Sequence, residues 1–484
     1  MTNNTRISRR QGLLGLFGGS LGLRAFVTGL PAWYLMNPRR ATAQDLQCAI
    51  NARDNLQYLI LSVSSNGDPL NCNVPGTYEQ TAIVHPTQTE VEQVPLTIGG
   101  NTYGAALPWA DPSVLSPTDM AMGVATPATG QLPSSVLART AFFHHRTGTT
   151  VHGDQPKVMK LLGDMSGGEM IISAYAKHLS TCFGTVQAPP ISVGARGNSS
   201  ELVSFAGRTL PSISPTQLKQ LLTGSTTDPL VKARTLRDQA LDQLNQMAKS
   251  DGSDLQKQFL DKLATSQTQV RELATQLGTT LSAITADDVK GQALAAAALI
   301  SANVTPVVTI HLSFGGDNHT DTNLQAEADQ HVSGVKGIQQ VMSALAGLSD
   351  AAGVSLTDRV TFATLNVFGR NLNAIQKVTD RTGRDHFGNH SVMVMIGKNI
   401  KAGVIGGVVA ASTSATAAFQ AGDIDSATGA QVTGGDIPVT QSQAAAVRTL
   451  GAALGIPDSV AAADYTAGAG GKVVTAALTN LPTG

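Results

Sequence analysis

The sequence predicts an α/β fold, in which a mostly parallel sheet is flanked by helices and carries a helical insertion. Short apolar runs rich in β-branched residues recur along the chain, and amphipathic stretches with helical spacing lie between them. A central segment instead repeats leucine at helical spacing with mixed charges on its polar face. Strand patterns that alternate with helical patterns favour a parallel sheet covered on both faces.

The first 43 residues have the pattern of a targeting segment. Arg9 and Arg10 precede a glycine-rich, weakly apolar stretch over 13–36, and small residues at 41–43 form a cleavage pattern. Arg24 and the glycines make this stretch a poor membrane span, so we expect no stable membrane span after processing. The segment therefore predicts export by the twin-arginine translocase to the periplasm or beyond, with the working chain starting near Gln44.

The charge of the chain argues against a nucleic-acid partner. Residues 1–43 contain six basic and no acidic residues, so their removal would lower the net charge from −1 to −7. The remaining chain is mildly acidic and has no basic run, whereas nucleic-acid-binding domains concentrate Lys and Arg.

The three cysteines, Cys48, Cys72 and Cys182, do not have the spacing of a zinc ribbon. One disulfide and one free thiol would suit an oxidising compartment, and Cys48–Cys72 is the closer pair in sequence. Three unpaired cysteines in the core are the alternative.

The N-terminal part of the predicted core spans 44–213. A strand over 58–63 ends at the turn Asn66-Gly67-Asp68-Pro69, and loops rich in Pro, Thr and Gly follow. A second strand is predicted over 136–143 and a helical stretch near 155–180.

Residues 214–300 read as a mostly helical insertion or cap. A capping residue precedes proline at Ser214 and at Asp228, and leucines then recur at helical spacing. The C-terminal part of the core spans 301–484. It is predicted to hold strands over 307–312, 359–365 and 392–397 and a helix over 325–348.

Polar clusters adjoin these strands, where open parallel sheets build their sites. The clusters are the turn at Asp68 and the segments 144–152, 317–321 and 383–390. Eight of the ten histidines fall within 144–152, 311–331 and 386–390. Asp and His together suit zinc, manganese or a similar divalent ion. Ligand chemistry points to Asp317 with His319 and to Asp385 with His386, and ordinary turn chemistry is the alternative for Asp68.

Several motifs together resemble the domain of unknown function 1501 family. They are the twin-arginine start, the Asn-Gly-Asp-Pro-Leu-Asn turn, Gly-Gly-Asp-Asn-His at 315–319, Phe-Gly-Arg at 368–370 and Gly-Arg-Asp-His at 383–386. Proteins of this family are exported and are related in fold to the alkaline phosphatase and sulfatase superfamily. The resemblance is strongest over 306–409.

The resemblance implies an alkaline phosphatase-like fold that holds one or two divalent metals above a parallel sheet. Zinc or manganese is the expected metal. By motif, Asp68 would be an early carboxylate ligand, and Asp317 and His319 the central ligands. Asp385 and His386 would be the late pair, with His390 as an extra ligand. A nucleophile is expected near 149–152, with Thr150 and His152 as the candidate catalytic residues. The implied substrate is a small anionic phosphate or sulfate ester.

Val367 departs from the family pattern, which commonly has an acidic residue immediately before Phe-Gly-Arg. The early Gly-Gly-x-Asp-Gly pattern is also changed, to Ser65-Asn66-Gly67-Asp68-Pro69. The sequence therefore leaves two alternative functions. One is an exported metal-dependent ester hydrolase, and the other is a non-catalytic secreted or surface protein that keeps the fold for binding or assembly.

Overall fold

The computed structural model describes most of the chain after its first 55 residues. The described residues are 56–67, 69–110, 134–183, 189–194, 203–205, 208–210, 212–223, 231–250, 252–254, 256–265, 277–312, 316, 318–350, 352–372, 383–411 and 419–482. The predicted export signal, Cys48, Asp68 and Asp317 lie outside these residues.

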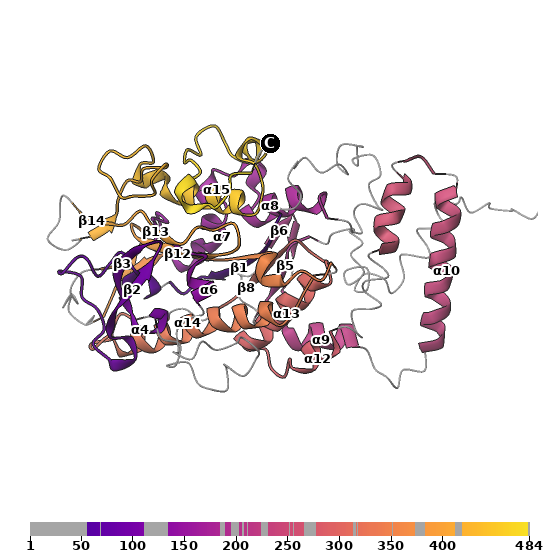
Figure 1. Ribbon diagram of the computed structural model, residues 1–484, viewed down its shortest axis with the longest axis horizontal. Coiled ribbons are helices and arrows are strands. Elements are labelled where there is room, and N and C mark those ends of the chain that lie inside the picture. The colour runs from indigo at the N-terminus through magenta and orange to yellow at the C-terminus, as the bar shows by residue number, and fades with distance from the viewer. Residues whose placement is uncertain are drawn as a thin grey trace, which may run out of the picture.

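A seven-stranded sheet forms the centre of the molecule, with the order β13-β4-β12-β9-β1-β8-β5 (Figure 1). Six strands run in one direction, and β12 runs in the other, antiparallel to β4 and β9. The predicted α/β fold with a mostly parallel sheet is therefore confirmed. The strands are β1 Tyr58–Ser64, β4 Thr140–His145, β5 Ile191–Val193, β8 Val307–Ile310, β9 Val360–Asn366, β12 Ser391–Ile396 and β13 Gly403–Ile405.

The reversed direction of β12 brings the segment before it to the same sheet edge as the segments after the parallel strands. Ser391, the first residue of β12, pairs with His145, the last residue of β4. Ser64 at the end of β1 pairs with Asn366 at the end of β9. Residues 383–390 therefore meet the turns that follow β1, β4, β8 and β9 at one edge.

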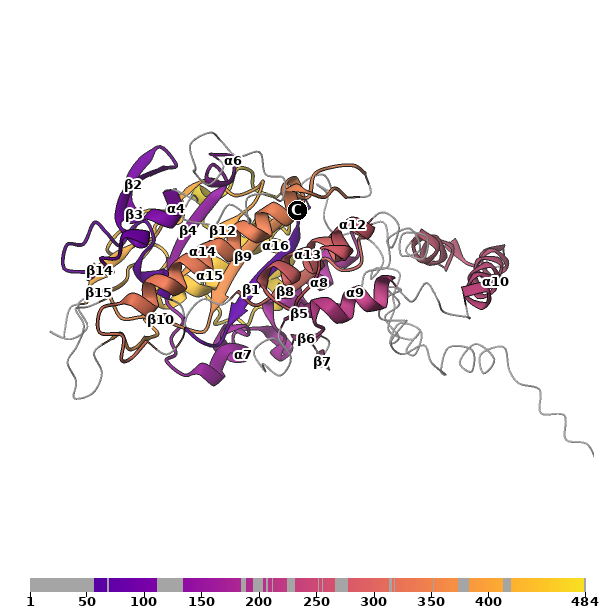
Figure 2. The same cartoon turned by 90° about the horizontal axis from the view of Figure 1, so that it is seen from below.

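Two apolar layers cover the sheet, because alternate residues of each strand point to opposite faces. Ile60 and Phe362 pack in a cluster with α13 (Val289–Ser301) and α14 (Gln325–Ala346). Leu59 and Leu61 pack in a second cluster with α8 (Ile171–Ser180) and α15 (Ser442–Ala453). Figure 2 shows α13 and α14 lying across one face of the sheet. Full burial of a Leu, Ile or Phe side chain contributes about 1.5–3 kcal/mol, so these layers hold the strand ends in place.

Two of the predicted elements differ in detail. The strand expected over 136–143 is a short helix, α6 (Ser134–Leu137), followed by β4. The helical stretch expected near 155–180 is α7 (Gln155–Val158) and α8, with 3₁₀ turns at Leu161–Gly163 and Ser166–Gly168 between them. Leu161, Leu162 and three glycines have positive φ in this interval, and left-handed residues end a right-handed helix.

The described part of the region predicted as an insertion is mostly helical. It contains α9 (Pro215–Thr223), α10 (Val231–Ser250), a helical stretch over 256–265, α12 (Gly278–Ser282) and α13. Helix α10 stands away from the sheet in Figure 1, and its Leu244 and Met247 are exposed. Helix α13 belongs to the layer on the sheet, since nearly every residue from Gly291 to Ile300 is buried.

Among the described residues, four two-stranded antiparallel sheets lie outside the main sheet. They are β2–β3 (Gln93–Ile98 and Asn101–Ala106), β6–β7 (Val203–Phe205 and Arg208–Leu210), β10–β11 (Gly369–Arg370 and His386–Phe387) and β14–β15 (Val408–Ala410 and Phe419–Ala421). The remaining short α-helices of the described residues are α4 (Leu107–Ala110) and α16 (Asp458–Ala461). The β10–β11 pair joins the Phe-Gly-Arg motif to the Gly-Arg-Asp-His motif.

Cys72 is a buried thiol that is not in a disulfide, so the expected Cys48–Cys72 pairing is wrong. Its Sγ atom lies 3.5 Å from Asn71 Oδ1 and 3.8 Å from the carbonyl oxygen of Arg370. Cys182 is disulfide-bonded, so the alternative of three unpaired cysteines is also wrong. In the described part of the chain, no helix combines the length and the apolar character that crossing a membrane requires.

Candidate metal site

The turn at 318–321 and the segment 383–386 lie directly against each other. The Gly383 amide donates to the His319 carbonyl at 2.8 Å, and the Arg384 amide donates to the Asn318 carbonyl at 3.1 Å. A Cβ atom on Gly383 would lie 1.8 Å from the Asn318 oxygen, so this contact requires glycine. Two motifs about 65 residues apart in sequence are thereby joined at the sheet edge.

The two histidines of these segments face each other through their Nε2 atoms, which are 3.1 Å apart. His386 Nδ1 donates to the carbonyl oxygen of Thr150 at 2.9 Å, which places the ring proton on Nδ1. His319 Nδ1 lies 2.9 Å from Asp385 Oδ1, and the carboxylate favours a proton on that nitrogen. Burial is the largest cause of a lowered pKa for His386 and favours the neutral form of this ring.

His152 and Phe368 pack beside His386, and the positive charge of Arg370 also acts on it. The His152 ring lies edge-on to the His386 ring with 4.5 Å between centroids, and its Nδ1 donates to the Ser65 carbonyl. The Phe368 ring stacks on His386 at 4.3 Å. A hydrogen bond to a carbonyl oxygen fixes the proton of His152 on Nδ1, so Nε2 is the proton-accepting atom of this ring.

The geometry of His319 and His386 fits a shared cation. Two imidazole nitrogens, each about 2.0–2.1 Å from one zinc ion at a tetrahedral angle, are roughly 3.3 Å apart, and here they are 3.1 Å apart. Ligating histidines usually direct the other ring nitrogen to a carboxylate or a carbonyl oxygen, as His319 and His386 do here. Without a cation, a shared proton would have to separate the two nitrogen lone pairs.

The described residues supply two such nitrogens and no more. Among them, no group of three or more His, Cys, Asp or Glu side chains has the arrangement of a metal site. A complete zinc site needs at least three protein ligands, so further ligands would have to come from outside the described residues. Asp68 and Asp317, two of the sequence-predicted ligands, belong to that part of the chain.

His390 lies in a separate buried network. His144 Nε2 donates to the Pro75 carbonyl at 2.9 Å, so His144 Nδ1 accepts from His390 Nε2, also at 2.9 Å. His390 Nδ1 in turn accepts from Asn71 Nδ2 at 3.0 Å. Both ring nitrogens of His390 are engaged in these hydrogen bonds, and the structure does not bring them to His319 and His386. Burial lowers the pKa of His144 to about 4 and holds that of His390 well below its usual range.

The loop at 147–152 contributes backbone as well as side chains. Thr150 is exposed, and its carbonyl orients His386. The Thr149 hydroxyl donates to Asp154 Oδ2 at 2.7 Å. The amides of Thr147 and Gly148 donate to the Gly388 carbonyl, and a Cβ on Gly388 would lie 2.5 Å from the Thr149 oxygen. The structure thus places Thr150, His152, His319, Asp385 and His386 in one neighbourhood.

Two residues that support the site had no role in the sequence interpretation. Arg384 and Glu327 are completely buried and form an ion pair with 2.6 Å between Nε and Oε2. The sequence pattern could have revealed the burial of Glu327, because this residue lies on the same buried face of α14 as His331, Gly334 and Ile338. A carboxylate on a buried helix face needs a partner.

Residues 170–433 match the family described as protein of unknown function (DUF1501). This is more than half of the 484 residues, so the chain belongs to that family. The matched range contains His319, Asp385 and His386 and begins after His152. No curated protein and no solved structure matches the chain. The resemblance to the family that the motifs carry is thereby confirmed.

Val367 lies where the resemblance leads one to expect an acidic residue. Its side chain is fully buried in the apolar cluster that includes Leu61 and Leu365, and its amide donates to the Ser64 carbonyl at 3.0 Å. The position therefore contributes to packing between β9 and the Phe-Gly-Arg motif.

Proposed function

We propose that this protein is an exported, metal-dependent hydrolase of the alkaline phosphatase and sulfatase type that acts on small phosphate or sulfate esters. The observation that carries the proposal is the approach of His319 Nε2 to His386 Nε2, with Asp385 and the Thr150 carbonyl behind the two rings. Zinc or manganese suits imidazole and carboxylate ligands. When bound, such a cation supplies positive charge to the ester oxyanion and acidifies a bound hydroxyl group.

Each residue of the site is assigned one role in the proposed reaction. His319 and His386 hold the cation, Asp385 orients His319, and the Thr150 carbonyl orients His386. His152 Nε2, beside His386, accepts or returns a proton at the reacting group. The exposed Thr150 is the candidate nucleophile, since its neighbour Thr149 already donates its hydroxyl to Asp154.

The proposed place of action is the periplasm or the exterior of the cell. The paired arginines, the weakly apolar stretch and the small residues at 41–43 support export through the twin-arginine translocase. The disulfide at Cys182 is in keeping with an oxidising compartment. An export route for folded proteins would allow the cation to be bound before transport.

Metal analysis of the purified chain starting at Gln44 tests the proposal. We expect stoichiometric zinc or manganese in the wild type. His319→Ala and His386→Ala should each raise the metal Kd by at least about 100-fold, and Asp385→Asn by about 10–100-fold. Turnover of an aryl phosphate or aryl sulfate should fall further in His319→Ala and His386→Ala than in Asp385→Asn.

His178→Ala is the matched control, because His178 also pairs with a carboxylate, that of Asp464, away from the site. It should leave the metal content unchanged. A wild-type protein without stoichiometric metal, or a His386→Ala variant with wild-type affinity, would contradict the proposal.

A second function is favoured by Val367, the buried apolar residue at a position where the family commonly carries an acid. In this alternative the protein keeps the fold for binding or assembly and catalyses no reaction. Robust hydrolysis of an aryl phosphate or sulfate that is abolished by Asp385→Ala would exclude it.

A further inference from the structure

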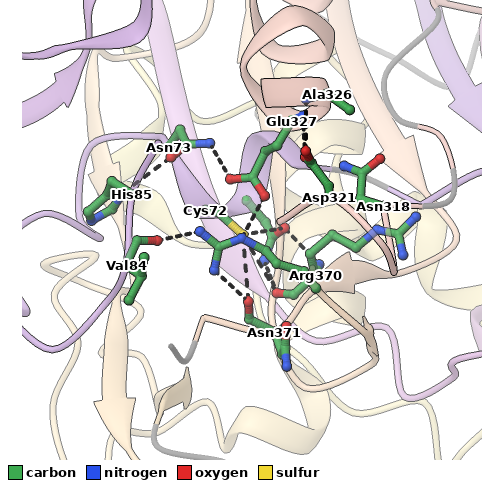
Figure 3. A network of polar contacts seen from close by, with 12 residues as sticks. Cys72, Asn73, Val84, His85, Asn318, Asp321, Ala326, Glu327, Arg370 and Asn371 are labelled. Atoms are coloured by element: carbon green, nitrogen blue, oxygen red, sulfur yellow. Dashed lines mark hydrogen bonds and ion pairs between the residues drawn. The ribbon is translucent and has the colours of Figure 1, made fainter. Parts of the chain in front are cut away.

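A network of polar contacts surrounds Glu327 on α14, with Asn73, Val84 and Asn371 as neighbours (Figure 3). Arg384 Nε donates to Glu327 Oε2 at 2.6 Å, and Glu327 Oε1 accepts from Asn73 Nδ2 at 2.9 Å. Arg384 Nη1 donates to the Asn371 carbonyl at 2.9 Å, and Nη2 donates to the Val84 carbonyl. The guanidinium group therefore connects α14, the segment after β10 and the loop before β2.

This network continues directly into Asp385, a residue of the candidate metal site. Asn371 and Asp385 are joined by two hydrogen bonds, from the Asn371 amide to the Asp385 carbonyl and from the Asp385 amide to Asn371 Oδ1, each 3.1 Å long. Arg384 precedes Asp385 and His386 in the chain, so its position sets the direction in which these two side chains leave the backbone. The orientation of Asp385 and His386 thus depends on where Arg384 is held.

The same helix holds the opposite turn. Asp321 accepts from the amides of Ala326 and Glu327 through its two carboxylate oxygens, at 3.1 and 2.9 Å. Asn318 and Gln330 exchange a pair of side-chain hydrogen bonds, both 2.9 Å long. Helix α14 is therefore the common support for the turn that carries His319 and the segment that carries His386.

A buried ion pair contributes little net stability compared with a well-packed apolar pair, because both charges have lost their hydration. Its directional hydrogen bonds are what an apolar pair cannot replace. We propose that Glu327 and Arg384 are positioning residues that set Asp385 and His386 relative to His319, so that affinity for the cation depends on a pair that does not contact it. This inference rests on the proposed function for its metal readout.

Three variants test the role of the pair in the full mature chain. Glu327→Gln removes one charge, Arg384→Lys keeps the charge but loses the planar fork, and the double variant Glu327→Leu with Arg384→Met replaces the pair by apolar side chains. The measurements are zinc affinity by competition with a chelator, the thermal midpoint by circular dichroism, and amide hydrogen exchange over 318–321 and 384–390. Asp458→Asn is the matched control, because Arg448 and Asp458 form a two-pronged ion pair elsewhere.

We expect all three variants to raise the zinc Kd by about 10–100-fold, the range typical of groups that orient metal ligands. Amide exchange in both segments should accelerate in the same variants. The double variant should have a higher thermal midpoint than the Glu327→Gln variant, because neither charge is left buried without its partner, and it should not regain zinc affinity. Asp458→Asn should lower the midpoint and leave zinc affinity unchanged.

Wild-type zinc affinity in the folded double variant would overturn the positioning role, as would unchanged exchange in Glu327→Gln and Arg384→Lys. If the wild type binds neither zinc nor manganese, the proposed function fails. The exchange data then decide the inference alone, because they report the placement of the two segments without a cation.

Discussion

Replacing Gly383 with alanine is expected to separate the two halves of the candidate metal site and to raise the zinc Kd at least about 100-fold. The added Cβ would lie 1.8 Å from the Asn318 oxygen and 2.8 Å from the Asp321 amide nitrogen. Both are backbone atoms and cannot rotate away. Overpacking of this kind costs about 1–3 kcal/mol even where side chains can adjust. The two turns must move apart instead, which carries His319 away from His386.

Gly468→Ala is the matched control, because a Cβ at Gly468 meets no atom within 4 Å and the residue has no positive φ. Chelator competition and urea unfolding of both variants give the comparison. A Gly383→Ala protein that binds zinc as tightly as the Gly468→Ala protein would show that the contact between the turns does not govern the site.

Acidification from pH 6.5 to 5.5 is expected to destabilise the protein by several kcal/mol, because five histidines are held neutral in the folded state. Burial lowers the pKa of His85 and His331 to about 3 and that of His144 and His145 to about 4, and holds the pKa of His390 far below 6.5. The unfolded chain takes up these protons near pH 6.5, and the folded chain does not. Stability is therefore fully present above pH 6.5 and is lost as the pH falls towards 4, by about 1 kcal/mol per histidine over this first pH unit.

His331→Leu provides a test of the cause. Neither ring nitrogen of His331 has a hydrogen-bond partner within the described structure, and its ring packs edge-on against Trp109. An apolar side chain removes the titrating group without breaking a hydrogen bond. Between pH 6.5 and 5.5, the unfolding free energy of this variant should therefore fall by about 1 kcal/mol less than that of the wild type. Urea unfolding at intervals between pH 5 and 8 measures this. An unfolding free energy that stays constant from pH 7 to 5.5 would contradict the expectation.

The alternation of apolar runs was sufficient to predict the class of fold. The runs at 58–63, 307–312 and 359–365 became β1, β8 and β9 with small shifts at their ends, and the helix expected over 325–348 is α14. The direction of β12 could not be read from its own sequence. A buried strand has the same apolar pattern in either direction, and only the order of its neighbours reveals which one it adopts.

The neighbourhood of His319, Asp385 and His386 was predictable from sequence because all three are polar residues placed beside buried strands. The role of His390 was not, since its hydrogen bonds run to Asn71 and His144, which lie far away in the chain. The Glu327–Arg384 pair is similar. The helical pattern of α14 places Glu327 on a buried face, but only the tertiary fold shows that its partner is Arg384, with 2.6 Å between Oε2 and Nε.

The position of β1 has a consequence for the order in which the chain can fold. This strand occupies an inner place in the sheet, yet its partners β8 and β9 are drawn from residues 307–310 and 360–366. At about 5–20 residues per second, a ribosome needs on the order of 15 s to 1 min to supply them. Until then β1 has no sheet partner, and native contacts of such long sequence separation form slowly. In a nascent chain of this design, β1 stays accessible to chaperones until about three quarters of the residues have been synthesised.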